Sequence, residues 1–294
     1  MFVVSCSGGG KLAKSLARLL NASFEEISLE RFPDGELHLR FPRENYNGEN
    51  VVLVQSLSPS PNEKLLELLL AERGAKELGA KKLTAVIPYL AYARQDSRFN
   101  PGEVVSNKTV CDFIQHAGAD DFYAVASHLH RVRSFSQLFS IPAQDVLMSE
   151  EMANWITKKI GRKNVVVVGP DGESIRLVKP VADLLSCDYG TFTKKRLSGS
   201  RIKHLSAPEV EVKGKHVVII DDIVSTGATV IDAAKILKKM GAVKVSCICV
   251  HLMQEQSGRK LLKSGLKFFA CSNTISSRYS ELDAAYPIAK AMRQ

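Results

Sequence analysis

Two adjacent carboxylates end an apolar run in the second half of the sequence, and small hydroxyl residues follow them. The stretch VVIIDDIVSTGATV, residues 217–230, carries this pair as Asp221 and Asp222. Carboxylates in such a position can accept hydrogen bonds from sugar hydroxyls or hold water bound to magnesium. A strand pattern that reads as buried and ends in two acids therefore indicates a ligand site rather than core packing.

The residues after the two acids could bind a phosphate group. Gly227 lets the backbone curl around an anion, and its small neighbours leave the N–H groups accessible. A helix pattern follows at residues 228–241, and its amino end would add the positive end of the helix dipole. The cradle comprises Ser225, Thr226, Gly227, Ala228 and Thr229. A plainer alternative, that Ser225 or Thr226 only caps the helix, leaves the paired acids unexplained.

Three further polar stretches carry side chains suited to phosphate chemistry. Residues 31–41, RFPDGELHLRF, predict a tight turn between two strands. Residues 88–108 could neutralise and hydrogen-bond a triphosphate through Arg94, Gln95, Arg98 and Lys108. Residues 192–206 predict a basic loop that carries Lys194, Lys195 and Arg196. Taken alone, the first would be an ordinary hairpin and the third a solvated basic loop, whereas packing hardly explains the second.

Strand and helix patterns alternate along the chain and would position these stretches. Apolar runs such as NVVLVQS, NVVVVG and HVVIIDD each precede a helix-like segment. This alternation predicts an α/β fold with mainly parallel sheets flanked by helices. Ligands of such sheets bind outside the carboxyl ends of the strands, which is where residues 221–229 would lie.

The order of elements occurs twice, which predicts two tandem domains of similar fold. Val51 aligns with Val217 at an offset of 166 residues, and the helix patterns after them also match. We expect one domain over residues 1–145 and a second over residues 146–294; whether the extreme C-terminus packs back on the first domain stays open. The first copy has Gln55 and Ser56 in place of the two acids, so this fold does not itself require them.

Composition favours a soluble protein that binds polyanions. The 294 residues are 45% hydrophobic and 24% charged, and 40 Lys and Arg against 31 Asp and Glu give a net charge of +9. Nucleic acid is the weakest candidate partner because aromatic residues make up only 7% of the chain. We expect no membrane partner, since no apolar run approaches the roughly 18 residues that span a bilayer. The six scattered cysteines indicate reduced core thiols. The N-terminal MFVVSCSGGGKL lacks the pattern of a signal peptide, so we expect a cytoplasmic location by default.

The two acids and the Ser/Thr/Gly loop resemble the phosphoribosyl-diphosphate loop of type I phosphoribosyltransferases. With PDGE at residues 33–36, ARQD at residues 93–96 and KKR at residues 194–196, the chain resembles the ribose-phosphate diphosphokinase family, especially its archaeal members. The motifs occur in family order over essentially the whole chain. This resemblance implies two duplicated phosphoribosyltransferase-like domains. It also implies transfer of the β,γ-diphosphoryl group of MgATP to the C1 hydroxyl of ribose 5-phosphate, with release of AMP.

The resemblance implies roles for the matching residues. Lys194 and Arg196 would be catalytic and close over the transferring group. Ribose 5-phosphate would contact Arg196, Asp221, Asp222 and the loop from Ser225 to Thr229. ATP would contact Phe32, Asp34, Gly35, Glu36, Arg94, Gln95, Asp96 and Arg98. The adenine contacts would come from a neighbouring subunit, which implies a homo-oligomer, a dimer or higher.

Magnesium would be held through His130 and Asp171, with His128 as a further candidate. The sequence departs from the family here, because the family usually has an aspartate where His128 stands. An imidazole is a poorer partner than a carboxylate for a hard ion. The segment RVRSF that follows is also more basic than the family pattern, and GPDGESIRL departs from it after the aspartate.

Two other functions stay open. A phosphoribosyltransferase would use the same DDIVSTGAT loop, although it does not account for the duplication, PDGE or ARQD. A non-catalytic regulatory paralogue is favoured by the altered His128-Leu129-His130 segment. The presence of Lys194, Arg196 and both acids argues against it.

Overall fold

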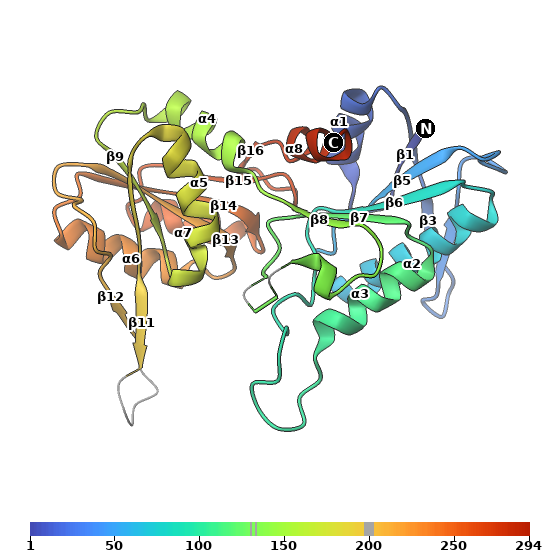
Figure 1. The fold of residues 1–294 in the computed structure, drawn as a ribbon, viewed down its shortest axis with the longest axis horizontal. Helices are drawn as coiled ribbons and strands as arrows, with labels where there is room; N and C mark the ends of the chain where they lie inside the picture. The colour runs from blue at the N-terminus through green and yellow to red at the C-terminus, as the bar shows by residue number, and fades with distance from the viewer. Residues whose placement is uncertain (130, 133, 197–202) are drawn as a thin grey trace. The chain divides into compact units, whose positions relative to one another are not determined.

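The protein consists of two α/β units, shown as a ribbon in Figure 1. Unit 1 comprises Met1–Val146 together with Ala284–Gln294, and unit 2 comprises Leu147–Asp283. The computed structural model describes residues 1–129, 131–132, 134–196 and 203–294, but not the side chains of residues 194–196 and 203–205.

A six-stranded parallel sheet in the order β2-β1-β5-β6-β7-β8 forms the centre of unit 1. Its strands are β1 (Phe2–Ser5), β2 (Ser23–Glu26), β5 (Asn50–Val54), β6 (Lys82–Ile87), β7 (Asp121–Val125) and β8 (Ala143–Val146). The crossover helices are α1 (Gly10–Leu20), α2 (Pro61–Glu77) and α3 (Ser106–Ala117). A separate antiparallel hairpin pairs β3 (Ser28–Arg31) with β4 (Leu37–Arg40). The apolar part of β5 is buried throughout, as expected for a strand covered on both faces.

Unit 2 is built on a second six-stranded parallel sheet, in the order β10-β9-β13-β14-β15-β16. Its strands are β9 (Val165–Gly169), β10 (Asp188–Thr191), β13 (His216–Val224), β14 (Lys244–Leu252), β15 (Phe269–Ser272) and β16 (Ser280–Leu282). Its helices are α4 (Ser149–Lys159), α5 (Ile175–Leu185), α6 (Ala228–Lys239) and α7 (Glu255–Lys263). A separate hairpin pairs β11 (Thr193–Arg196) with β12 (Lys203–Ser206).

The two sheets have the same topology, which confirms the predicted α/β fold and its duplication. Strands β2, β1, β5, β6, β7 and β8 of unit 1 correspond in order to β10, β9, β13, β14, β15 and β16 of unit 2. In unit 2, Val217 and Ile219 of β13 pack with Val230 and Leu237 of α6 in one buried cluster. Alternate β-branched residues of the strand thus meet the apolar stripe of the helix that follows it.

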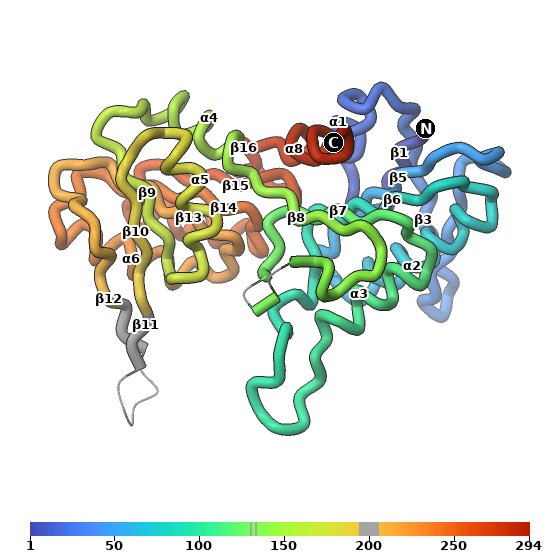
Figure 2. Tube along the Cα trace, viewed as in Figure 1, coloured from blue at the N-terminus to red at the C-terminus, as the bar shows by residue number. Residues whose placement is uncertain are grey.

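The last helix of the chain, α8 (Ala285–Met292), belongs to unit 1 and packs against α1. Figure 2 shows this red segment beside the blue α1. The Arg293 guanidinium donates a hydrogen bond to the Leu19 carbonyl at the end of α1. None of the helices among the described residues has the length and apolar character needed to cross a membrane.

All six cysteines are free, as expected for core thiols. Five of them are buried, and Cys187 is partly exposed. Burial is the main cause that raises the pKa of the Cys247 and Cys249 thiols well above the ordinary value. These thiols therefore behave as small apolar core groups rather than as nucleophiles.

Candidate active site

The paired acids lie within strand β13, on a part that extends beyond one of its neighbours. The pairing of β13 with β9 runs from His216 to Ile219, whereas its pairing with β14 continues to Val224. We had expected Asp221 and Asp222 to follow the end of the strand. The strand continues past them because β14 is equally long and extends the ladder on that side.

Three carboxylates lie close together at this edge of unit 2. Burial raises the pKa of Asp221 well above its usual range, and the charges of Asp222 and Asp171 raise it further. Asp171 follows β9 and accepts hydrogen bonds from the Ser174 N–H at 3.2 Å and the Ser174 hydroxyl at 2.9 Å. Three neighbouring carboxylates, one of them with a raised pKa, favour cations and hydroxyl donors as ligands.

The predicted metal ligands divide between the two units. Asp171 lies in unit 2, and His128 lies in unit 1 after β7. His130 lies outside the residues that the structure describes. Within the described ranges, no group of three or more His, Cys, Asp or Glu side chains is arranged so that it could hold a metal ion.

The predicted phosphate cradle is formed by a loop and the first turn of α6. Gly227 adopts a left-handed conformation with φ of 76°, and the helix begins at Ala228, so Ala228 and Thr229 belong to its first turn. This first turn contains no acidic residue. The Thr226 hydroxyl lies 3.4 Å from the Ala228 N–H, at the long limit of a hydrogen bond, so it caps the helix only weakly. Capping therefore does not account for the loop, and its N–H groups suit an anion.

Helix α7 contacts this loop through two of its residues, Ser257 and Leu261. The buried Ser257 hydroxyl donates a hydrogen bond to the Ser225 carbonyl. A Cβ atom added at Gly227 would lie 3.1 Å from a methyl group of Leu261. The Leu261 side chain of α7 therefore also limits the space beside Gly227. The sequence analysis missed both supporting residues because they belong to a segment that carries no phosphate-binding pattern.

The basic stretch forms a hairpin rather than the loop that we expected. Lys194 and Arg196 lie on β11, where their backbone positions pair with Leu205 and Lys203 of β12. The antiparallel ladder satisfies the backbone hydrogen bonds of both segments, which a loop would leave to water. Figure 1 shows the hairpin projecting from the sheet of unit 2.

The corresponding position in unit 1 is closed by internal hydrogen bonds. The Gln55 side chain accepts from the Gly8 N–H and donates to the Glu67 carboxylate, each at 2.7 Å. The other oxygen of Glu67 accepts from the Ser7 N–H, also at 2.7 Å. Gln55 and Glu67 are both buried. In this copy a carboxylate of the chain itself accepts hydrogen bonds from Ser7 and from Gln55, the residue that stands in place of the first acid.

The PDG turn of unit 1 has the predicted conformation. Phe32 and Glu36 are joined by a backbone hydrogen bond of 2.9 Å across the turn, and Gly35 has a φ of 96°. The Asp34 carboxylate accepts from the Glu36 N–H at 3.2 Å. The Phe32 ring is 49% exposed and lies 5.1 Å from the His38 ring, which leaves an accessible aromatic face.

The ARQD loop between β6 and α3 is organised around Glu103, a residue that the sequence analysis missed. The Glu103 carboxylate accepts from the Gln95 amide at 3.1 Å and from the Phe99 N–H at 2.8 Å. Its backbone carbonyl accepts from Arg98 Nε at 3.1 Å. The hydrogen bonds from Asn100 and Phe99 lower the pKa of Glu103. Glu103 thus holds two of the residues expected to bind ATP: its carboxylate holds Gln95, and its backbone carbonyl holds Arg98.

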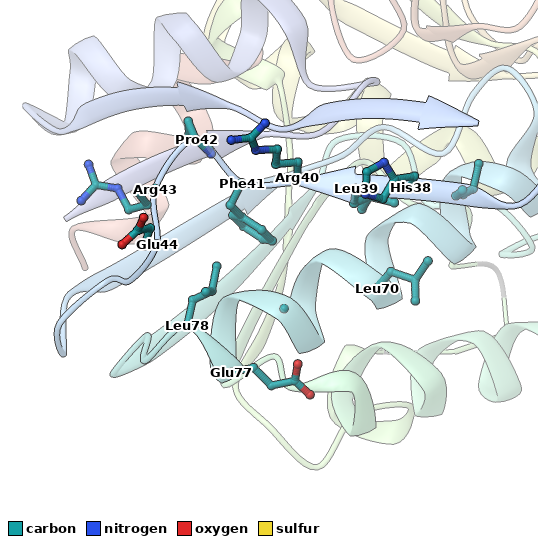
Figure 3. Close-up of a pocket in the computed structure, with 12 residues that line it drawn as sticks. His38, Leu39, Arg40, Phe41, Pro42, Arg43, Glu44, Leu70, Glu77 and Leu78 are labelled. Atoms are coloured by element: carbon teal, nitrogen blue, oxygen red, sulfur yellow. The ribbon is translucent and has the colours of Figure 1, made fainter. Parts of the chain in front are cut away.

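A groove of about 660 Å³ in unit 1 lies apart from these residues. It runs between α2 and the segment from Leu37 to Glu44, and Figure 3 shows Phe41 and Leu78 among the residues lining it. None of the residues expected to bind ATP lines this groove.

Comparisons with known proteins match both units. The model of the N-terminal domain of ribose phosphate pyrophosphokinase matches residues 1–118, and the phosphoribosyl transferase domain matches residues 140–280. Ribose-phosphate pyrophosphokinase of Methanopyrus kandleri is 34% identical over 99% of this chain and 98% of its own length. The enzyme of the same name from Methanothermobacter thermautotrophicus is also 34% identical, over 99% of both chains.

A solved structure agrees with these relatives. The crystal structure of phosphoribosylpyrophosphate synthetase from Mycobacterium smegmatis superposes with a TM-score of 0.84 and 25% identity, covering 99% of this chain and 97% of that one. Pyrophosphokinase and diphosphokinase are two names for one activity, so the family expected from the motifs is confirmed. The chain matches the length of these relatives, about a third of its residues are identical to theirs, and its two units repeat one topology. This chain therefore belongs to the ribose-phosphate pyrophosphokinase family.

Proposed function

We propose that this protein transfers the β,γ-diphosphoryl group of MgATP to the C1 hydroxyl of ribose 5-phosphate in the cytoplasm. The products are phosphoribosyl diphosphate and AMP. One observation carries the proposal: two adjacent carboxylates lie on β13, shortly before a weakly capped helix amino end in unit 2, in a chain whose full-length relatives are named for this activity. Asp221 and Asp222 would accept hydrogen bonds from ribose hydroxyls, and the first turn of α6 would bind the 5-phosphate.

The reaction needs charge neutralisation and alignment more than covalent chemistry. The oxygen of the C1 hydroxyl attacks the β-phosphorus and its proton passes to solvent, while the bond between the β-phosphorus and the α,β-bridging oxygen breaks so that this oxygen leaves with AMP. Lys194 and Arg196 would stabilise the charge of the transferring group. Magnesium suits the oxygen donors of Asp171 and its neighbours, and it would offset the negative charge of the diphosphoryl group.

The ATP side of the reaction is assigned to unit 1. Arg94, Gln95 and Arg98 would bind the phosphates, with Asp96 in the same loop. The exposed Phe32 ring, with Asp34 and Glu36 in the same turn, would contact adenine. An exposed adenine contact at the tip of a hairpin fits a homo-oligomer in which the hairpin of one subunit reaches the ATP of its neighbour.

An assay of AMP release tests the proposal. Purified protein with ATP and magnesium should release AMP only when ribose 5-phosphate is present, as measured by ion-exchange chromatography. Lys194→Ala should lower turnover by about a hundredfold or more, because a cation of the transition state is lost, while ribose 5-phosphate binding is retained. Absence of ribose-dependent AMP would contradict the proposal, and consumption of phosphoribosyl diphosphate with a free base would indicate a transferase instead.

A further inference from the structure

Arg131 lies outside the motifs that identify the family, yet it binds a residue of the ARQD loop. The Asp96 carboxylate accepts from the Arg131 guanidinium at 3.0 Å and from the Arg131 backbone N–H at 3.2 Å. The Asp96 side chain is only 1% exposed, whereas that of Arg131 is 53% exposed. The arginine therefore reaches in from the surface to a buried carboxylate.

The same guanidinium contacts the loop at a second point. Its central carbon lies 4.8 Å from the centre of the Phe99 ring, which is the distance of a cation–π contact. Phe99 is fixed in turn by its hydrogen bond to Glu103. Arg131 thus holds the loop on both sides of Arg98, from a segment that follows β7 rather than from the loop itself.

The charge of Asp96 explains why such a contact matters for function. A buried carboxylate without a cationic partner is costly, and a negative charge two residues from Arg94 would repel the phosphates of a nucleotide. The ion pair with Arg131 offsets the negative charge of Asp96, so that this charge repels the phosphates of a nucleotide bound at the loop less strongly. The Asp96 carboxylate then shapes the loop, and its oxygens are already engaged by Arg131.

We propose that Arg131 is a positioning residue for ATP, which acts by holding Asp96 and Phe99 so that Arg94 and Gln95 present their donors to the nucleotide phosphates. The contact also joins the loop to the segment that carries His128, so the two segments would move together. This inference rests on the proposed function, because it takes the ARQD loop as the site of the nucleotide phosphates.

Steady-state kinetics test the proposal through three variants. Arg131→Met keeps the apolar stem and removes the charge, and it should raise the KM for ATP about tenfold or more, since a hydrogen-bonded charge pair is lost. The KM for ribose 5-phosphate should stay unchanged and kcat should change little. Arg131→Lys should restore part of the affinity for ATP, because a lysine keeps the positive charge but lacks the planar guanidinium with its several N–H donors. Arg73→Met, which breaks an exposed pair with Glu77 on α2, is the matched control.

A double-mutant cycle tests whether the two side chains act as a pair. Combining Asp96→Asn with Arg131→Met should give a KM for ATP close to that of one single variant, because each removes the same contact. Additive effects of the two changes, or an unchanged KM in Arg131→Met, would overturn the proposal.

Hydrogen exchange without substrate separates this inference from the proposed function. Amides of residues 94–104 should exchange faster in Arg131→Met than in the native protein or in Arg73→Met, since the loop has lost its outside contact. Equal exchange in all three proteins would also overturn the proposal. The native protein could make no ribose-dependent AMP while residues 94–104 still exchange faster in Arg131→Met. The proposed function would then be wrong, and the role of Arg131 in holding the loop would be supported.

Discussion

Glu72 is an acidic residue buried where its carboxyl group has no hydrogen-bond partner among the described residues. It lies on the buried face of α2 with none of its surface exposed. Burial raises the pKa of this carboxyl well above its usual value. Burial therefore favours the neutral form of this acid, and leaving its oxygens without hydrogen bonds destabilises the folded state.

Replacing this side chain by an apolar one of similar size should stabilise the protein. Glu72→Leu should raise the free energy of unfolding by about 1–3 kcal/mol, because a buried unpaired polar group is removed. The unfolded chain loses the Glu72 proton near the ordinary pKa of 4.5, whereas the folded protein keeps it to higher pH. Native stability thus falls as pH rises above that value, and the advantage of Glu72→Leu grows with it.

Urea unfolding at several pH values measures this difference. Glu77→Leu makes the same change at an exposed position of the same helix and should have little effect. A constant difference across pH, or a destabilised Glu72→Leu protein, would show that the carboxyl has a partner that holds it ionised.

Residues that stand in one short motif can be proposed as site residues from the sequence alone, whereas residues that act through distant partners cannot. Asp34, Gln95 and Asp221 stand in contiguous motifs. Arg131 contacts Asp96 from 35 residues away, and Ser257 contacts Ser225 from 32 residues away. No local pattern marks either residue, because the contact exists only after the strands have been brought side by side.

The strand, loop and helix from β13 to α6 form the element to which we assign ribose 5-phosphate binding in our proposal, and α7 contacts the loop through Ser257. Ser257→Ala removes the hydrogen bond to the Ser225 carbonyl. We expect the KM for ribose 5-phosphate to rise about threefold to tenfold, the value of one neutral hydrogen bond, with the KM for ATP unchanged.

Ser264, which caps the carboxyl end of α7, provides the matched control for this measurement. Its hydroxyl donates to the Leu261 carbonyl at 2.7 Å, a hydrogen bond within the end of α7 rather than to the loop, so Ser264→Ala should leave both KM values as they are. Equal changes in the two variants would mean that α7 as a whole is disturbed and that the Ser257 contact has no special role.

The sequence predicted the order of the elements because apolar periodicity is a local property. It did not predict that Lys194 and Arg196 lie on a strand, since β11 is short and polar and is stabilised by pairing with β12. It also placed the two acids after β13 rather than within it. Both differences arise from ladder partners that are distant along the chain, which periodicity alone does not reveal.

Across the whole molecule, the positive charge is concentrated in unit 2. Residues 147–283 contain 22 Lys and Arg against 14 Asp and Glu, so their net charge of 22 − 14 = +8 accounts for most of the +9 of the chain. A positive field of this kind attracts anionic substrates and is screened by salt. We expect kcat/KM for ribose 5-phosphate to fall steeply as sodium chloride rises, with kcat at saturation changing less. A kcat/KM that does not depend on salt would rule out this electrostatic attraction.

The place of α8 in the chain has a consequence for synthesis on the ribosome. Unit 1 begins the chain, yet its surface on α1 is covered by a helix that follows the whole of unit 2. Domains of most proteins can fold one after another as they emerge. Here unit 1 emerges first, but it is completed only by α8, which is translated after unit 2. The surface of α1 therefore stays uncovered in the nascent chain until α8 has emerged. Mutations that slow the folding of unit 2 would therefore also prolong the exposure of unit 1 to chaperones and proteases.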